Sequence, residues 1–329
     1  MKPFLSMLQP FLLAFTVAAM PTWAQTQADN FPSKPIRFIN PFQAGATTDV
    51  LARIVSEKMS THWSQPVVVD NKPGAGGLLA ADLTAKSAPD GHTIVAVISS
   101  HVVQKNLVKN MPFDALKGFE PVILLARTPL VLLTVNSMPV KTVPDFINYA
   151  RQQAKDGKPL TYGTSGIGAA VHLTTEYFKQ VANVPLVHVP YKGGAPAMLD
   201  LLGGHIPVVM SGLYTASQAI QAGKVKPIAV TTAKRLARYP NIPTMQESFP
   251  GFVEDEWWVV LAPAGTPKSI VNKLNAEIAR ITALPDVMDL LRTQGVEIAT
   301  GSADEFARFL QQEVSRWKKV IAETGLRVE

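Results

Sequence analysis

The sequence predicts an α/β fold of two lobes, with mainly parallel sheets flanked by helices. Three observations lead to this prediction. Short runs rich in β-branched residues alternate with helical patterns along most of the chain. Two of these runs follow each other too closely for the helical crossover that paired parallel strands need. The last third of the chain turns almost entirely to helical patterns.

The first strand is expected at 36–40, and the first helix at 48–63, where apolar residues recur every three or four positions on one face. Alternation of this kind indicates βαβ units. A helix lies between most of the later strands. These strands are expected at 67–69, 93–98, 122–125, 130–135, 160–162, 186–189, 207–210, 227–230 and 257–261.

The two strands at 122–125 and 130–135 are the close pair, and we interpret residues 126–129 as a crossing from one lobe to the other. A second crossing is expected near 251–256, where Glu254, Asp255 and Glu256 are interpreted as an exposed linker. Lobe one then comprises 31–127 and 251–329, and lobe two comprises 128–250. A cleft is expected between them.

The C-terminal segment is expected to form helices that pack on lobe one. Thr266-Pro267 begins a helix to about Ala283, Pro285 begins another, and Ser302-Ala-Asp-Glu305 is a capping box. From Phe306 to Ile321, spacings of three and four mark one buried stripe.

Residues 1–24 read as a cleavable secretory signal peptide, because Lys2 precedes a short apolar run and small residues occupy 22 and 24. The run between Pro10 and Pro21 is too short to span a bilayer, which takes about 20 residues. We therefore expect a soluble, exported protein.

The composition excludes several classes of protein. The net charge of +6 is scattered, and no stripe of Lys and Arg with interleaved aromatics indicates a nucleic-acid groove. The chain has no cysteine, so an exported form depends on the size of its core, which 47% hydrophobic residues can supply. The surplus of positive charge weakly favours acidic small ligands, although an ordinary solvated surface explains it too.

The segment Pro41–Asp49, between the first strand and the first helix, is the strongest candidate for a binding loop. Ligands of open α/β sheets bind beyond the carboxyl ends of strands, where helix N-termini offer unpaired N–H groups to anions. Gly45 permits close approach of the backbone. The candidate ligand contacts in this loop are Phe42, Gln43, Ala44, Gly45, Thr47, Thr48 and Asp49. An ordinary capped turn would have the same pattern.

Lobe two has a similar segment at Gly163–Gly168, where a strand again leads into a loop of Gly, Ser and Thr residues and then into a helix. Its candidate contacts are Thr164, Ser165, Gly166, Gly168 and His172. Two such loops suggest an anion held from both sides. One loop roughly balances the several kcal/mol that desolvation of a carboxylate costs, and two leave a surplus. Neither loop is a P-loop or a dinucleotide fingerprint.

Further candidate contacts follow other strands. Ser99 and Ser100 end the strand at 93–98, and Tyr191 and Gly193 follow the strand at 186–189, although turn glycines explain 193–194 equally well. The glycines at 74–77 are interpreted as a tight turn.

Enzyme signatures are few. The six histidines show no metal-ligand spacing, and Ser165 lacks the flanking residues of a nucleophile elbow. A hydrolase built on Ser165 and His172 is one alternative. No metal and no cofactor are expected.

Several stretches in matching order resemble the Bug family, the substrate-binding proteins of tripartite tricarboxylate transporters. They are Pro35-Ile-Arg, Pro41-Phe with Gly45 and Asp49-Val-Leu-Ala-Arg53, Asn71-Lys-Pro-Gly-Ala-Gly-Gly77, Ala88-Pro-Asp-Gly-His-Thr93, Tyr162-Gly-Thr-Ser-Gly166, His188-Val-Pro-Tyr-Lys-Gly193 and Leu261-Ala-Pro-Ala-Gly-Thr-Pro267. The resemblance implies a type II periplasmic-binding-protein fold that closes on its ligand. It also implies that backbone amides and waters of the loops at 42–49 and 164–168 hold one ligand carboxylate.

The chain departs from the family pattern at two places. The first loop reads Gln43-Ala-Gly-Ala46 where the family commonly has Pro-Pro-Gly-Gly, and Met210-Ser211-Gly212 stands where Phe-Asp-Asn is frequent. Loss of that Asp removes a partner for a ligand ammonium. We therefore expect an amine-free dicarboxylate or aromatic acid near Ser211, rather than an amino acid.

The resemblance implies a monomeric periplasmic receptor that delivers its ligand to membrane permease subunits. A sensory module that presents the same closed form to a membrane kinase is a second reading, and the sequence does not separate the two.

Overall fold

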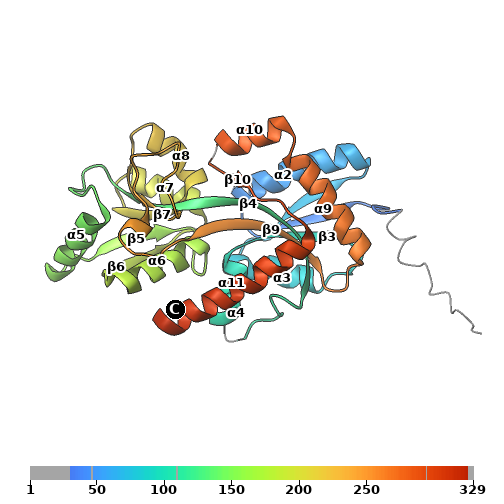
Figure 1. The fold of residues 1–329 in the computed structure, drawn as a ribbon, viewed down its shortest axis with the longest axis horizontal. Coiled ribbons are helices and arrows are strands. Elements are labelled where there is room, and N and C mark those ends of the chain that lie inside the picture. The colour runs from blue at the N-terminus through green and yellow to red at the C-terminus, as the bar shows by residue number, and fades with distance from the viewer. Residues whose placement is uncertain (1–29, 46, 109, 294, 325–329) are drawn as a thin grey trace, which may run out of the picture.

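The computed structural model describes residues 30–324 except 46, 109 and 294. The expected signal peptide, 1–24, lies outside the described residues. The chain forms two groups of elements side by side, connected by two long strands, β4 and β9 (Figure 1). We call the group around β1–β3 lobe one and the group around β5–β8 lobe two.

Lobe one is built on a mixed sheet in the order β2-β1-β3-β9-β4. β1 pairs in parallel with β2 and β3, whereas β9 runs antiparallel to both β3 and β4. A short strand, β10, pairs with β4. The bounds are β1 Ile36–Asn40, β2 Val67–Asn71, β3 Thr93–Ile98, β4 Phe119–Thr134, β9 Asp255–Pro263 and β10 Glu297–Ile298.

Lobe two continues from the far half of β4, in the order β4-β7-β5-β6, with β8 also pairing with β4. β5 is parallel to β6 and β7, while β4 is antiparallel to β7 and β8. The bounds are β5 Leu160–Thr164, β6 Leu186–Pro190, β7 Val208–Gly212 and β8 Lys226–Val230.

The expectation of two separate strands at 122–125 and 130–135 was wrong. They form one strand, β4, whose first half pairs with β9 and whose second half pairs with β7 and β8. Pro129, which suggested a break, is tolerated where β4 changes partners. The next amide, of Leu130, donates 3.0 Å to the side chain of Thr231.

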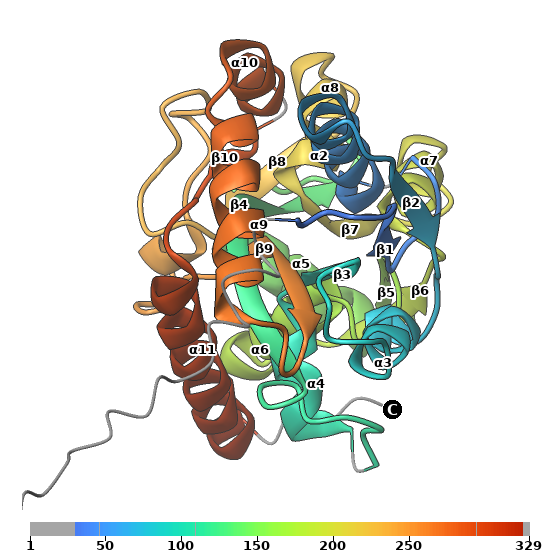
Figure 2. The same cartoon turned by 90° about the vertical axis from the view of Figure 1, so that its right-hand side faces the viewer.

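Helices cover both faces of each sheet because the buried strands carry apolar residues on both sides. In β3, Ile94 and Ile98 face a cluster with α2 and α9, while Val95 and Val97 face a cluster with α3, α4 and α11. Figure 2 shows α10, α9 and α11 along one side of lobe one. The bounds in lobe one are α2 Thr47–Trp63, α3 Leu78–Ala85, α4 Ser100–Leu107, α9 Lys268–Thr282, α10 Pro285–Thr293 and α11 Ala303–Thr324.

In lobe two, α5 and α6 pack on one face of the sheet, and α7 and α8 pack on the other. The bounds are α5 Val143–Lys155, α6 Ala170–Ala182, α7 Gly194–Leu202 and α8 Leu213–Gln221.

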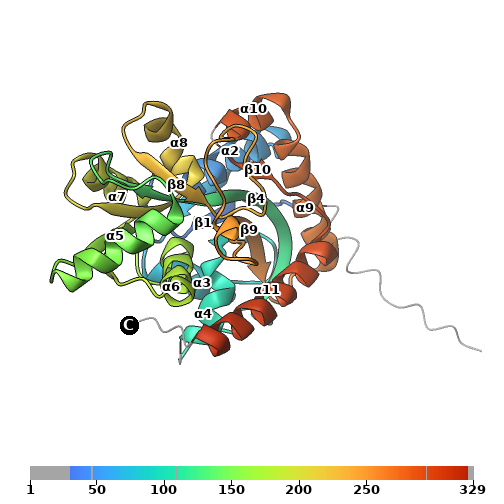
Figure 3. The same ribbon diagram turned by 60° about the vertical axis from the view of Figure 1, so that its left-hand side comes forward.

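α11 has the features that its sequence predicts. Ser302 and Glu305 exchange the hydrogen bonds of a capping box, and Phe306, Leu310 and Trp317 are buried. The helix also reaches lobe two, where the ring of Trp317 meets that of Tyr177 in α6 edge-on. Figure 3 shows α11 extending from the side of α9 towards α4 and α6.

The expectation of an exposed acidic linker at 254–256 was also wrong. Glu254 is only 3% exposed and is held by Arg316 of α11 at 2.6 and 3.0 Å. Asp255 accepts a hydrogen bond from Arg127 of β4 at 3.1 Å. These partners lie 62 and 128 residues away in sequence, so the local pattern of three acids gave no sign of them.

Candidate functional site

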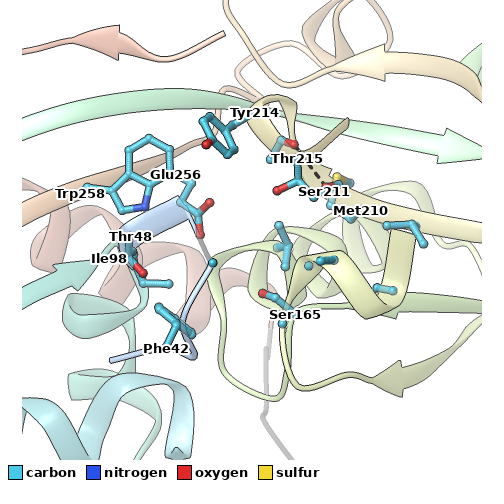
Figure 4. Close-up of a pocket in the computed structure, with 18 residues that line it drawn as sticks. Phe42, Thr48, Ile98, Ser165, Met210, Ser211, Tyr214, Thr215, Glu256 and Trp258 are labelled. Atoms are coloured by element: carbon cyan, nitrogen blue, oxygen red, sulfur yellow. Dashed lines mark hydrogen bonds between the residues drawn. The ribbon is translucent and has the colours of Figure 1, made fainter. Parts of the chain in front are cut away.

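The candidate site lies where the two sheets present the carboxyl ends of their parallel strands. Strands β1, β5, β6 and β7 each lead into a helix there, and the N-terminal residues of α2, α6, α7 and α8 line one cavity of ≈ 150 Å³. Figure 4 shows that Thr48 and Trp258 of lobe one lie opposite Met210, Ser211 and Ser165 of lobe two. Helix N-termini carry partial positive charge and free N–H groups, so their convergence favours an anion.

A second cavity, of ≈ 590 Å³, adjoins the first and shares Phe42 and Ser165 with it. It is lined by the other half of the loop at 41–48, by the turn at 73–76 and by the loop at 164–169. We refer to the segments 41–48 and 164–169 as loop one and loop two. The two loops therefore face each other across both cavities.

Asp49, which is 2% exposed, holds loop one in place through hydrogen bonds. Its carboxylate accepts hydrogen bonds from the Gly45 amide at 2.9 Å, from Arg53 Nε at 2.9 Å and from Asn71 Nδ2 at 2.8 Å. Burial would raise the pKa of Asp49, but these hydrogen bonds outweigh it and lower the pKa below its usual value. Asp49 is therefore a charged anchor for the loop.

Loop two is held by a neutral histidine pair. The rings of His172 and His188 stack with centroids 4.0 Å apart. His172 Nδ1 accepts from the Gly168 amide at 3.1 Å, and His188 Nε2 lies 2.6 Å from Thr164 Oγ1. Burial lowers the pKa of both rings, that of His188 to about 4, so both are uncharged at neutral pH.

The glycine amides of the two loops donate to side chains in or next to the loops. Gly45 donates to Asp49, Gly166 donates to Thr164 Oγ1 at 3.3 Å, and Gly168 donates to His172. The amides in the first turn of α2 have no acceptor within the helix itself, as in every helix. Thr48 adds a buried hydroxyl that has no hydrogen-bond partner among the described residues. These groups, with Ser165, are donors of the two loops that can serve a ligand.

The structure places the sequence-predicted residues in three groups. The first cavity is lined by Phe42, Gly45, Thr48, Ser165, Gly193 and Ser211. The second is lined by Phe42, Gln43, Ser165, Gly166 and Tyr191. Seven others line neither cavity: Ala44, Asp49, Ser99, Ser100, Thr164, Gly168 and His172. The main chain of Thr47 begins α2, and its side chain lies outside what the structure describes.

Most residues in the last group support the site from outside. Asp49, Thr164 and His172 hold the loops, as described above. Ser100 donates to the Gly76 carbonyl at 3.3 Å, and Ser99 is buried without a partner among the described residues. The turn at 73–76, interpreted from sequence as structural only, lines the second cavity and so adds to the site.

Sequence reasoning missed several residues of the first cavity. Tyr214 and Thr215 begin α8, directly after β7, where the carboxyl-end rule would have found them. Glu256 and Trp258, in contrast, lie near the start of a strand, β9. β9 is antiparallel to β3, with Ile98 opposite Trp258, so the start of β9 reaches the edge where β3 ends. No rule based on carboxyl ends indicates them.

No Lys, Arg or His side chain is among the described residues that line the first cavity. An acidic side chain, Glu256, lines this cavity, and burial raises its pKa to about 7. Within the described part of the chain, no cluster of three His, Cys, Asp or Glu residues could hold a metal ion. No described helix is long and apolar enough to cross a membrane.

The hydrolase alternative finds no support in the geometry. Among the described residues, no hydrogen bond joins the Ser165 hydroxyl to His172 or to another base. The Nδ1 atom of His172 is already occupied by the Gly168 amide.

Two lobes connected by two strands, with opposed loops around a shared cavity, define the class of two-lobed solute-binding receptors. The profile of the tripartite tricarboxylate transporter family receptors matches residues 51–326. BugT from Bordetella pertussis is 33% identical over 309 residues, which are 93% of this chain and 94% of BugT. The chain belongs to this TctC/Bug family of periplasmic solute-binding receptors.

Two solved structures are similar throughout. Rpa4515 from R. palustris with adipate has a TM-score of 0.83 and 36% identity, covering 90% of this chain and 99% of that one. MatC (Rpa3494) from Rhodopseudomonas palustris with bound malate has a TM-score of 0.82 and 31% identity, covering 88% and 100%. These similarities confirm the expected two-lobed binding-protein fold.

Proposed function

We propose that this receptor binds an amine-free organic carboxylate, a dicarboxylate or an aromatic acid, between its lobes and delivers it to membrane permease subunits. The observation that carries the proposal is the convergence of four helix N-termini, those of α2, α6, α7 and α8, on one cavity. Dipoles and hydroxyls there offer a site for negative charge without a cationic side chain.

The balance of energies supports a site made of two opposed loops. Desolvation of a carboxylate costs several kcal/mol. Each charge-assisted hydrogen bond returns about 1.5–3 kcal/mol, and a helix N-terminus adds about 0.3–2 kcal/mol. The hydroxyls of Thr48 and Ser165, one on each side, return about 3–6 kcal/mol together, and the four helix N-termini add about 1–8 kcal/mol. Only both contributions together offset the desolvation cost and approach the net value of about −8 kcal/mol that micromolar binding needs.

Two lines of argument favour an amine-free ligand. Adipate and malate, the ligands of the two similar structures, are both dicarboxylates without an amine. In this chain Met210-Ser211-Gly212 puts a hydroxyl, not a carboxylate, on the cavity wall at the end of β7.

Closure would work by shifting a population. A ligand that contacts both lobes binds the closed form better and so increases its share. Gln104 of α4 supports this picture, because its side-chain amide lies 3.3 Å from the Gly76 carbonyl of lobe one and 3.5 Å from the Gly168 carbonyl of lobe two. The permease would recognise the closed form.

The proposal includes export, a monomeric state and a division of the chain. Residues 1–24 would be the signal peptide removed on export. Lobe one would comprise 31–127 and 251–329, and lobe two 128–250. The pairing of β4 and β9 with each other at Pro129 and Asp255, between the two sheets, supports these limits.

A matched ligand screen tests the function. Thermal unfolding with succinate, glutarate and adipate should show stabilisation, because a ligand that binds only the folded state raises the midpoint. Aspartate and glutamate, which differ from succinate and glutarate by one ammonium, should give smaller shifts. Absence of stabilisation by any carboxylate would contradict the receptor function, and tighter binding of the amino acids would contradict the ligand class.

A variant pair locates the site. Ser165→Ala should weaken binding of the best dicarboxylate by about three- to tenfold, because one hydrogen bond is lost. Ser315→Ala, on α11 away from both cavities, is the control and should bind like the parent. Recovery of the ligand unchanged after incubation checks that no turnover occurs.

A further inference from the structure

Glu256 occupies a special position on the wall of the first cavity. It lies near the start of β9, opposite Thr128 of β4, and lines the cavity with Trp258 and Tyr214. In Figure 4 its carboxyl group projects between Thr48 on one side and Ser211 on the other. It also packs against the start of α8, since a Cβ added at Gly212 would lie 3.3 Å from Glu256 Oε2. Its partly exposed surface therefore faces the ligand space.

The carboxyl group of Glu256 has no hydrogen-bond or ion-pair partner among the residues that the structure describes. Its neighbours in sequence both have one, Arg316 for Glu254 and Arg127 for Asp255. No hydrogen bond or ion pair joins the half-buried Glu256 to any described residue, so the desolvation of its carboxyl group is not offset within the described part of the protein. A polar group that is left unpaired in a ligand cavity indicates that the ligand supplies the partner.

The surroundings of Glu256 act on its protonation in opposite directions. Burial raises the pKa of Glu256 to about 7. From α8, Tyr214 is uncharged, because burial raises its pKa too. From α2, Asp49 is paired with Arg53, and from β4, Arg127 is paired with Asp255. The N-terminus of α8 favours the ionised acid, whereas an arriving ligand carboxylate disfavours it.

We propose that Glu256, in its neutral acid form, donates a hydrogen bond to the second carboxylate of a bound dicarboxylate and thereby selects dicarboxylates over monocarboxylates. This inference rests on the proposed function and identifies Glu256 as the group that binds the second carboxylate of the ligand. The first carboxylate is held by the free donors of loops one and two. Since the bound ligand requires the neutral form, binding takes up one proton wherever free Glu256 is ionised.

The direction of the pH dependence follows from this linkage. Below the pKa of free Glu256 the acid is already neutral, and affinity does not depend on its protonation. Above it, each complex must first acquire a proton, so affinity falls with rising pH by up to about tenfold per unit. The proposal therefore predicts weaker dicarboxylate binding from about pH 7 upwards.

Calorimetry with ligands of equal chain length tests the proposal. The dicarboxylate that stabilises the protein most among succinate, malate, glutarate and adipate is compared with the monocarboxylate and the ω-amino acid of the same carbon number, from pH 6 to 8.5. Titrations in two buffers of different ionisation enthalpy count the protons taken up. The expected result is tightest binding of the dicarboxylate, with proton uptake approaching one at pH 8.5.

Variants assign the effect to Glu256. Glu256→Gln keeps a hydrogen-bond donor and should flatten the pH profile, with proton uptake near zero. Glu256→Leu has no donor and should remove the preference for the dicarboxylate over the monocarboxylate at every pH. Glu57→Gln, an exposed glutamate of α2 outside both cavities, is the matched control and should keep the parental pH profile. Thermal unfolding checks that each variant folds.

The outcomes separate this inference from the function on which it rests. If none of the carboxylates stabilised the protein against thermal unfolding, the receptor function itself would be overturned. Carboxylate binding without proton uptake, or with a pH profile that Glu256→Gln leaves unchanged, would overturn only the role of Glu256. Tightest binding of the ω-amino acid would show that Glu256 is an ionised acceptor for an ammonium, and would overturn the inference as well.

Discussion

Loop one and loop two have the same design, since each follows a strand and leads into a helix, but different groups hold them in place. A buried carboxylate, Asp49, holds loop one by accepting from Gly45, Asn71 and Arg53. Loop two is held by uncharged imidazoles, His172 and His188. The comparison teaches that a buried charge can hold a cavity loop when a cation is paired with it, as Arg53 is with Asp49. In lobe two the anchor is neutral.

The largest expected effect comes from the anchor of loop one. Asp49→Ala leaves two part-buried donors, the Gly45 amide and Asn71 Nδ2, without this acceptor, and should lower the free energy of unfolding by about 2–3 kcal/mol. Urea unfolding measures this change. Asp286→Ala removes an exposed aspartate paired with Lys58, and should unfold like the parent. Equal midpoints for the two variants would contradict the anchor role.

The contribution of His188, which holds loop two, to the free energy of unfolding should depend on pH. An unfolded histidine has a pKa of about 6.5, whereas that of His188 in the folded chain is lowered to about 4. As the pH falls between these values, only the unfolded chain takes up the proton, so His188 contributes less and less to stability across this window. Ring resonances followed by NMR should titrate for His188 near pH 4. Titration near 6.5 would contradict a buried neutral anchor.

The same window separates the two loops. Asp49 keeps its charge at pH 5, because its pKa lies below the usual aspartate value. As the pH is lowered to about 4, folded His188 takes up its proton while Asp49 stays charged, so resonances of loop two should shift before those of loop one. Simultaneous disturbance would remove the distinction between the anchors.

A smaller effect is expected from the shape of loop one. Gly45 has φ +84°, and no atom would meet an added Cβ within 4 Å. Gly204, in a turn after α7, has φ +73° and equally free space. Alanine at either position should cost about 1–2 kcal/mol of backbone strain. Gly45→Ala alone should also weaken dicarboxylate binding in calorimetry, and equal affinities for the two variants would show that loop one does not shape the site.

The smallest effect concerns the contact between the lobes. Gln104→Ala removes two long hydrogen bonds, of 3.3 and 3.5 Å, that span the loops at 76 and 168. Their loss should reduce affinity by about threefold, which corresponds to about 0.6 kcal/mol. Gln152→Ala, which removes an exposed hydrogen bond to Asp156, is the control and should bind like the parent. A larger loss for the control would contradict the closing role of Gln104.

Much of the fold could be predicted because it depends on local patterns. The strand at 36–40, the helix that ends at Trp63 and the capping box at 302–305 all follow from spacing and cap residues. The single strand β4 could not be predicted, since Pro129 looks like a break until its antiparallel partners are known. Whether a proline ends a strand depends on which strands pair with it, and the sequence alone does not show that pairing.

The site divides in the same way. Loops one and two could be found because each follows a parallel strand, and both line the cavities. Glu256 could not, because β9 runs antiparallel and presents its start, not its end, to the cleft. Nor could the burial of Glu254 be read from sequence, since Arg316 lies 62 residues away.

The most direct test of the account is an NMR titration of backbone amides with the best dicarboxylate. The amides of Thr48 and Ser165, one from each lobe, should shift with the same midpoint, while that of Gly204 stays unchanged. A response from only one lobe, or two different midpoints, would contradict a carboxylate held from both sides.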